Sequence, residues 1–109
     1  MDKKRKIFRW SKDNDVELSE NSVRLKFGSP LKSRIKVGRY DRGEEFSGTF
    51  KQGYCYLLEG DCVLTIDYVC QLRTGDWLKF ERGNYSFVAG KCGAVVVWVW
   101  DFIDLEIDL

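Results

Sequence analysis

Hydrophobic and polar residues alternate with a period of two along several parts of the chain. The alternation is clear over Val23–Phe27, Arg34–Tyr40 and Ile103–Asp108, and it predicts half-buried strands. The run Ala94–Trp100 is apolar at every position, which is typical of a strand buried on both faces. No segment of helical length shows a 3.6-residue period, so the pattern predicts an all-β chain of about nine to eleven short strands.

A turn signal divides the most apolar part of the chain. Tyr54–Leu58 and Cys62–Ile66 are apolar, and Glu59-Gly60-Asp61 between them supplies the glycine that a short hairpin turn favours. We expect a hairpin in which Leu57 faces Cys62 and Cys55 faces Leu64. One face then carries Cys55, Leu57, Cys62, Leu64 and Ile66, and the other carries Tyr54, Tyr56, Leu58 and Val63. Turns at Gly75-Asp76 and Gly83-Asn84 separate further strands, which we expect over residues 45–50, 68–72, 76–80 and 85–89.

Composition fits one domain without a membrane segment. The chain has 109 residues and a formal net charge of +1, so no global field attracts nucleic acid or an anionic membrane. No apolar run approaches the ~20 residues that a membrane helix needs, and the basic start Met1–Lys6 lacks the apolar stretch of a secretory signal. We expect a cytoplasmic protein without nucleic-acid or membrane partners. Residues 1–22 are expected to form a basic arm with a short strand near Val16 and Leu18, and residues 23–109 the β-domain.

Four cysteines, Cys55, Cys62, Cys70 and Cys92, raise the question of disulfides or zinc. Their spacings do not form the CxxC pairs of common zinc sites, and three of the four lie within apolar strand patterns. We expect reduced and mostly buried thiols that act as small hydrophobic groups, as is usual in the cytosol. Two disulfides or a four-thiolate zinc site are the alternatives.

The order of the turns resembles the core of a cupin. The string Tyr54-Cys-Tyr-Leu-Leu-Glu-Gly60 is followed by Gly75-Asp76 and by Phe80-Glu-Arg-Gly83, and Arg42-Gly-Glu-Glu-Phe46 precedes it. Within the cupin superfamily, the string is most similar to small single-domain cupins related to ethanolamine-utilisation cupins and ureidoglycine aminohydrolase. The resemblance covers residues 34–100, and it implies a jelly-roll β-barrel in a single domain over residues 23–109.

The same resemblance locates the positions at which metal-dependent cupins carry two histidines, a glutamate and a third histidine. In this sequence these positions fall near Ser47, Thr49, Gly53 and Ser86, and the chain contains no histidine. Hydroxyl groups do not supply the imidazole or carboxylate that transition metals select. We therefore expect no metal and no cofactor, and none of the metal-dependent cupin reactions.

Metal-free catalysis is a separate possibility, with no catalytic residue assigned by the sequence. The absence of histidine removes the commonest general base and the Cys-His nucleophilic pair. Cys55 as a nucleophile requires a cationic neighbour, and none is visible in the sequence. Four carboxylates near turns, Glu44, Glu45, Glu59 and Glu81, are expected to be ordinary solvated acids; the alternative is a carboxylate in the barrel mouth with a raised pKa.

A small β-barrel can hold a ligand in its lumen. By alternation and the motif match, we expect Ser47, Thr49, Cys55 and Leu57 to point inward. Ser86, Val88 and one of Trp98 or Val97 are expected to join them, with Tyr40, Tyr85 and Trp77 at the mouth. The alternative is that these side chains simply fill the core.

Two functions follow as hypotheses. The first is a metal-free, cupin-like domain that binds a small molecule in the lumen or serves as a dimeric interaction module. The second is a metal-independent enzyme acting on a small metabolite, a nucleoside or ureide derivative by family analogy. We also expect a homodimer, because Ala94–Trp100 and residues 103–109 offer more apolar edge than a monomer needs to expose.

Overall fold

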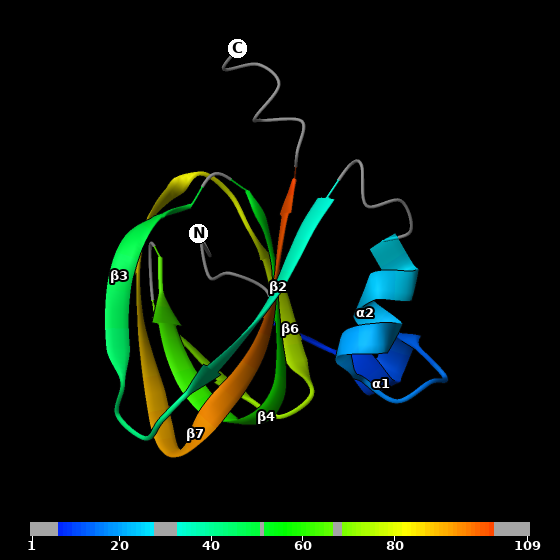
Figure 1. The fold of residues 1–109 in the computed structure, drawn as a ribbon, viewed down its shortest axis with the longest axis horizontal. Helices are drawn as coiled ribbons and strands as arrows, with labels where there is room; N and C mark the ends of the chain where they lie inside the picture. The colour runs from blue at the N-terminus through cyan, green and yellow to red at the C-terminus, as the bar shows by residue number, and fades with distance from the viewer. Residues whose placement is uncertain (1–6, 28–32, 51, 67–68, 102–109) are drawn as a thin grey trace, which may run out of the picture.

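The computed structural model describes residues 7–27, 33–50, 52–66 and 69–101, most of which lie in antiparallel strands (Figure 1). Two short helices lie beside the strands. In chain order the elements are β1 (Phe8–Arg9), α1 (Trp10–Asp13), α2 (Glu20–Phe27), β2 (Ser33–Tyr40), β3 (Glu45–Phe50), β4 (Gly53–Thr65), β5 (Val69–Arg73), β6 (Asp76–Phe80) and β7 (Gly83–Asp101).

Two long strands, β4 and β7, hold the barrel together. β7 pairs with β3 along its first half and with β2 along its second half, and β4 pairs with β7 along both halves. β4 also pairs with β6 near its start and with β5 near its end. Because both long strands bend, they pass from one layer of the barrel into the other (Figure 1). The expected all-β jelly roll is confirmed, with seven strands in the described ranges.

The predicted hairpin at Gly60 is wrong. β4 runs through this position as one strand, and Leu57 pairs with Val96 of β7 rather than with Cys62. The positive φ of Gly60, 83°, belongs to an irregularity in the β4–β7 register, where the strand bends instead of reversing. A bulge shifts the alternation of side chains as a turn does, so the two predicted faces of this stretch are nevertheless correct.

The separate strands expected at 85–89 and 94–100 form one continuous strand, β7. Gly93, with a φ of 75°, lies where β7 turns the corner of the barrel. Its second half is flanked by β2 on one side and by β4 on the other. Ala94–Trp100 is therefore not an open edge, so the expectation that this run exposes an apolar strand edge is wrong.

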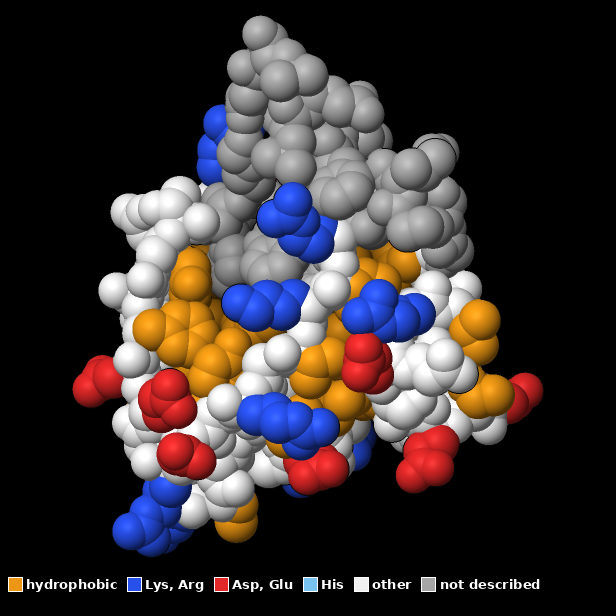
Figure 2. Space-filling view, in the orientation of Figure 1, with side chains coloured by type: hydrophobic (Ala, Val, Ile, Leu, Met, Phe, Trp, Pro, Cys, Tyr) orange, Lys and Arg blue, Asp and Glu red, His pale blue; other side chains and the backbone are white. Residues whose placement is uncertain are grey.

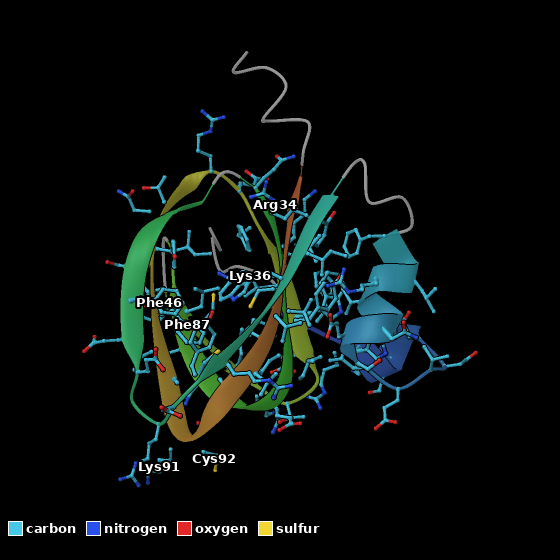
Figure 3. All side chains as sticks on the ribbon, in the orientation of Figure 1. Arg34, Lys36, Phe46, Phe87, Lys91 and Cys92 are labelled. Atoms are coloured by element: carbon cyan, nitrogen blue, oxygen red, sulfur yellow. The ribbon has the colours of Figure 1, made fainter. Side chains whose placement is uncertain are left out.

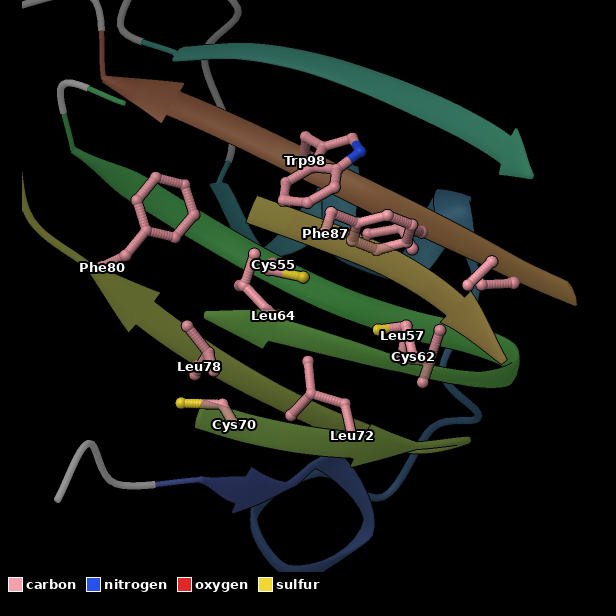
Figure 4. Packing of buried hydrophobic residues seen from close by; sticks show 13 residues of the cluster. Cys55, Leu57, Cys62, Leu64, Cys70, Leu72, Leu78, Phe80, Phe87 and Trp98 are labelled. Carbon is pink, nitrogen blue, oxygen red and sulfur yellow. The ribbon is translucent and has the colours of Figure 1, made fainter. Parts of the chain in front are cut away.

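The sheet buries two separate hydrophobic clusters, one on each face. The inner cluster fills the barrel (Figure 4), and its buried members are Cys55, Leu57, Cys62, Leu64, Cys70, Leu72, Leu78, Phe80, Phe87, Ala89, Ala94, Val96 and Trp98. The outer cluster consists of Trp10, Val23, Tyr56, Val97 and Val99, with Ile35, Val37 and Trp77 packed against it. Its members come from both the sheet and the helical segment, so α1 and α2 cover the outer face (Figure 1).

The strand predicted over Val23–Phe27 is instead the C-terminal part of helix α2. The backbone N–H of Ser22 donates to the Ser19 hydroxyl at 3.1 Å, and the Ser19 N–H donates to the Ser22 hydroxyl at 2.8 Å. This reciprocal cap satisfies backbone donors that the first helical turn leaves without partners. Val23 is completely buried, whereas Leu25 is 73% exposed. The short strand expected near Val16 and Leu18 is also wrong, since neither residue lies in a strand.

The N-terminal segment is attached to the β5–β6 turn. The Trp10 N–H donates to the Gly75 carbonyl at 2.8 Å, and the Arg9 guanidinium bonds to the buried Asp76 carboxylate at 2.5 Å. Residues 1–6, 28–32 and 102–109 lie outside the described ranges, so the basic start and the strand predicted over Ile103–Asp108 do too. Within the described part of the chain, no helix is long and apolar enough to cross a membrane.

Candidate functional site

Aromatic rings from β2, β3 and both halves of β7 gather on the inner face of the barrel. Phe46 and Phe87 stack with their centroids 4.8 Å apart and their planes inclined by 19°. The Tyr40 ring lies 5.1 Å from Phe46 and 4.9 Å from Phe87, and the Trp98 indole N–H donates to the Tyr40 hydroxyl at 3.0 Å. Tyr85 meets Phe46 edge to face at 5.9 Å. These five residues form the aromatic cluster.

The aromatic cluster is open to solvent between β2 and β3. In the described strands, β2 and β3 each pair with β7 and not with one another. Phe87 and Trp98 are buried, whereas Tyr40, Phe46 and Tyr85 are only partly buried. Figure 2 shows apolar side chains at the surface between these two strands, with Lys and Arg side chains lying across them.

Two of the cations on this surface come from β2. Lys36 pairs with Trp98 in the β2–β7 register, and Arg34 pairs with Trp100. Directly opposed residues in an antiparallel pair share a face, so Lys36 lies on the inner face with Trp98 (Figure 3). Ile35 and Val37, which alternate with these cations, pack on the outer cluster.

Five of the residues predicted to face the lumen or its mouth are oriented correctly. Cys55, Leu57 and Trp98 are buried in the inner cluster, and Tyr40 and Tyr85 pack against it. Val97, the alternative to Trp98, belongs to the outer cluster. Whether any of these side chains contacts a ligand stays a prediction.

Four other predicted lumen residues, Ser47, Thr49, Ser86 and Val88, point away from the lumen. Ser47 pairs with Ser86, and both are exposed. Thr49 donates a hydrogen bond to the Asn84 side chain at 3.0 Å on this exposed face, and Val88 is 38% exposed. The inward-facing positions of β3 and β7 are the neighbouring residues Phe46, Gly48, Tyr85 and Phe87. The prediction was therefore out by one residue, and a shift of one residue reverses the face of every side chain in a strand.

Trp77 does not line the mouth. It lies on the outer face, stacked between Phe8 at 4.6 Å and Tyr56 at 5.3 Å. Leu78, the next residue of β6, points into the inner cluster. The indole N–H of Trp77 and the hydroxyl of Tyr56 are buried without a hydrogen-bond partner.

The positions at which the resemblance to metal-dependent cupins places ligands do not suit a metal. Ser47, Thr49 and Ser86 are exposed on the face of β3 and β7 that points away from the lumen, and Gly53 has no side chain to offer a donor atom. Among the described residues, no group of three or more His, Cys, Asp and Glu side chains is placed to hold a metal ion. The donor set therefore does not fit a cupin metal centre.

The interior thiols and the turn carboxylates are also poor catalysts. Burial raises the pKa of the Cys55 thiol well above its ordinary value of 9.0, so the sulfur is held protonated rather than as a nucleophilic thiolate. Burial likewise raises the pKa of the Tyr40 hydroxyl, although the hydrogen bond from Trp98 opposes the shift. The four turn carboxylates, Glu44, Glu45, Glu59 and Glu81, are exposed.

Sequence reasoning missed Phe46, Phe87, Lys36 and Arg34 as residues of this face. The signal that identifies them is the alternation of β2 and β3 combined with the register against β7. Ile35 and Val37 mark the outer face of β2, so Arg34 and Lys36 must share the opposite face with Tyr40. The sequence does not show whether that opposite face looks into the barrel or into solvent.

No protein-family model and no curated protein matches the chain. Among solved structures, a protein of unknown function from Streptococcus pyogenes has a TM-score of 0.55 and 18% identity over 62% of this chain and 62% of its own. A cupin superfamily protein from Desulfitobacterium hafniense has a TM-score of 0.57 and 19% identity, covering 64% of this chain and 67% of its own.

Salicylate 1,2-dioxygenase from Pseudoaminobacter salicylatoxidans has a TM-score of 0.60 and 14% identity over 70% of this chain, but the match spans only 22% of the dioxygenase. At these identities the likeness concerns the fold alone. The chain has the cupin fold, as the turn pattern predicted. The narrower resemblance to ethanolamine-utilisation cupins and ureidoglycine aminohydrolase stays a prediction.

Proposed function

We propose that the protein is a metal-free cupin-like domain that binds a small molecule on its aromatic cluster. The observation that supports this most is the mixed burial of the cluster: Phe87 and Trp98 form a fixed wall, while Tyr40, Phe46 and Tyr85 stay partly open between β2 and β3. Ligand sites in β-barrels combine apolar and aromatic walls with a few fixed polar groups. The hydrogen-bonded Tyr40–Trp98 pair is such a polar group.

Binding fits this face better than catalysis does. General acid–base chemistry requires a group that exchanges its proton near neutral pH. The Cys55 and Tyr40 pKa values are both raised by burial, so both groups are neutral at that pH. A metal-independent enzyme would have to recruit an exposed turn carboxylate, and nothing in the site favours one of them.

A neutral planar probe tests the proposal without involving charge. We expect naphthalene carboxamide to bind the wild-type chain, as measured by calorimetry, and Phe46→Ala to weaken binding by about tenfold, since one stacked ring contributes about 0.5–1.5 kcal/mol beyond its buried area. Ser47→Ala is the matched control, because Ser47 is adjacent in β3 but lies on the opposite face. Absence of binding, or equal losses in the two variants, would contradict the proposal.

We also propose a homodimer, supported by the edges of β2 and β3. Each of these strands pairs only with β7 among the described strands, and an open strand edge is a ready template for pairing with another chain. Light scattering at micromolar concentration should report twice the chain mass. A monomer would end this proposal and leave the ligand proposal intact.

A further inference from the structure

We infer that the ligand of the aromatic cluster is a planar aromatic carboxylate, whose ring stacks on Phe46 and whose negative charge faces Lys36. The inference rests on the proposed ligand site and adds the chemical class of the ligand. Figure 3 shows Lys36 on the side of β2 that faces Phe46 and Phe87.

The polar groups of the site follow the inner face of β2 in a row. The Tyr40 side chain folds back along its own strand, so that a Cβ added to Gly38 would overlap the Tyr40 hydroxyl. Lys36 precedes Gly38 by two residues and shares its inward face, and alternate residues of a strand lie roughly 6.6 Å apart. The Tyr40 hydroxyl and the Lys36 ammonium therefore belong to one short stretch of β2, beside the partly open rings.

The hydrogen bonding of Tyr40 leaves a donor for a ligand. The Tyr40 oxygen accepts the Trp98 N–H, so the hydroxyl hydrogen remains to be donated. A carboxylate has acceptor sites on two oxygens. One oxygen can accept this hydrogen while the carboxylate also faces the Lys36 ammonium.

The charge of the inner face is positive at this end. Among inward strand positions whose side chains the structure describes, Asp76 is the one carboxylate, and it is bonded to Arg9 and to the Arg73 N–H. β4 and β7 separate its strand from β2. Glu44 also acts on Tyr40, but it lies in the exposed turn after β2 and accepts the Asp41 N–H. An anionic ligand therefore meets the Lys36 ammonium with no inward-facing carboxylate of the described strands beside it.

The shape of the site favours a flat ligand. Phe46 and Phe87 lie nearly parallel, 19° apart, and Tyr40 and Tyr85 border Phe46 at 5.1 Å and 5.9 Å. Aromatic pairs favour offset-stacked or edge-to-face contacts at centroid separations of about 4.5–7 Å. The planar ring of a ligand on the open side of Phe46 would make the same stacked or edge-to-face contacts with these side chains.

The test compares naphthalene carboxylate with the isosteric, neutral naphthalene carboxamide. For the wild-type chain at low salt we expect the carboxylate to bind about three- to tenfold more tightly, the range for a solvent-accessible ion pair with an added hydrogen bond. Lys36→Gln should abolish most of this preference while leaving carboxamide affinity within about twofold. Arg39→Gln, on the opposite face of β2, should keep the preference.

The outcomes separate the two proposals. If carboxamide binds as tightly as the carboxylate to the wild-type chain, or if Arg39→Gln removes the preference as fully as Lys36→Gln does, the ligand class is wrong while the ligand site stands. If neither compound binds, both proposals are wrong.

Discussion

Lys36 of β2 lies directly across from Trp98 of β7, so a cation and a buried indole share the inner face of the barrel. The Trp98 indole N–H donates to the Tyr40 hydroxyl. This hydrogen bond joins β7 to β2 and holds the polar end of the aromatic cluster in place. β2 owes this arrangement to its alternation, because every second residue from Arg34 to Tyr40 faces inward. The proposed ligand site requires this β2–β7 register, because a shift of one residue would move Lys36 to the outer face.

The first prediction separates the helix at 20–27 from the strand that the alternation suggested. In a strand, Val23, Leu25 and Phe27 share one face, whereas in helix α2 Val23 is buried and Leu25 is 73% exposed. Val23→Ala should therefore lower the free energy of unfolding by about 2 kcal/mol. Leu25→Ala should change it by less than about 0.5 kcal/mol. Urea denaturation measures both, and equal losses would support the strand.

The second prediction concerns the corner where β4 and β7 bend. Gly60→Ala should lower the free energy of unfolding by about 3 kcal/mol, because its Cβ would overlap the backbone carbonyl of Gly93. Gly43→Ala is the matched control: its φ of 75° is also positive, but no atom lies within 4 Å of the added Cβ. The control should lose only about 1 kcal/mol, the cost of the backbone conformation. Similar losses in the two variants would contradict the close approach.

Gly60 also shows how far the sequence predicts this fold. The alternation was sufficient for an all-β chain and for both faces of β4, while the cupin fold was implied by the resemblance of residues 34–100 to cupins. The turn residues and the alternation were not sufficient to distinguish a hairpin from a bulged strand, because both shift the alternation in the same way. That distinction depends on β7, which is distant in sequence.

Helix α2 was missed for a local reason. Val-Arg-Leu-Lys-Phe alternates as a strand does, yet Val23 and Phe27 are also four residues apart and lie on one helical face. The informative signal was Ser19-x-x-Ser22 with Leu18 before it and Val23 after it, the pattern of a capped helix with a hydrophobic staple. The orientation of Ser47 and Phe46 was mistaken for a different reason. The strand itself was predicted correctly, but which of its faces points into the barrel depends on the register with β7.

The third prediction concerns thiol reactivity. Cys55, Cys62 and Cys70 are buried in the barrel and Cys92 is exposed, all four without disulfides. A maleimide should therefore label one thiol rapidly in the native protein and all four after denaturation, as counted by mass spectrometry. Cys92→Ser should remove the rapid reaction. Rapid labelling of a second thiol would show that the barrel interior is open to reagent.

The fourth prediction concerns alkaline stability. Burial raises the pKa of the Cys62 thiol from 9.0 to about 12. Between these values the unfolded chain releases a proton that the folded chain keeps, so the free energy of unfolding should fall as pH rises, by up to about 1.4 kcal/mol per pH unit for this group. The contribution is fully present below pH 9.

The check is urea denaturation from pH 8 to pH 11. Cys62→Ala should show a shallower decline of the free energy of unfolding above pH 9. The variant lacks the thiol whose proton the folded chain keeps and the unfolded chain releases. Cys92→Ala should keep the wild-type slope, because this thiol is exposed in the folded protein. An unchanged slope in Cys62→Ala would contradict the assigned cause.

A crystal structure of the protein with naphthalene carboxylate bound tests the central claim most directly. The account predicts the naphthalene ring against Phe46 between β2 and β3, with its carboxylate within hydrogen-bond distance of Lys36 Nζ and the Tyr40 hydroxyl. A compound bound instead on the outer face, against Trp77 or in the groove lined by Arg9, Trp10 and Gly75, would contradict it.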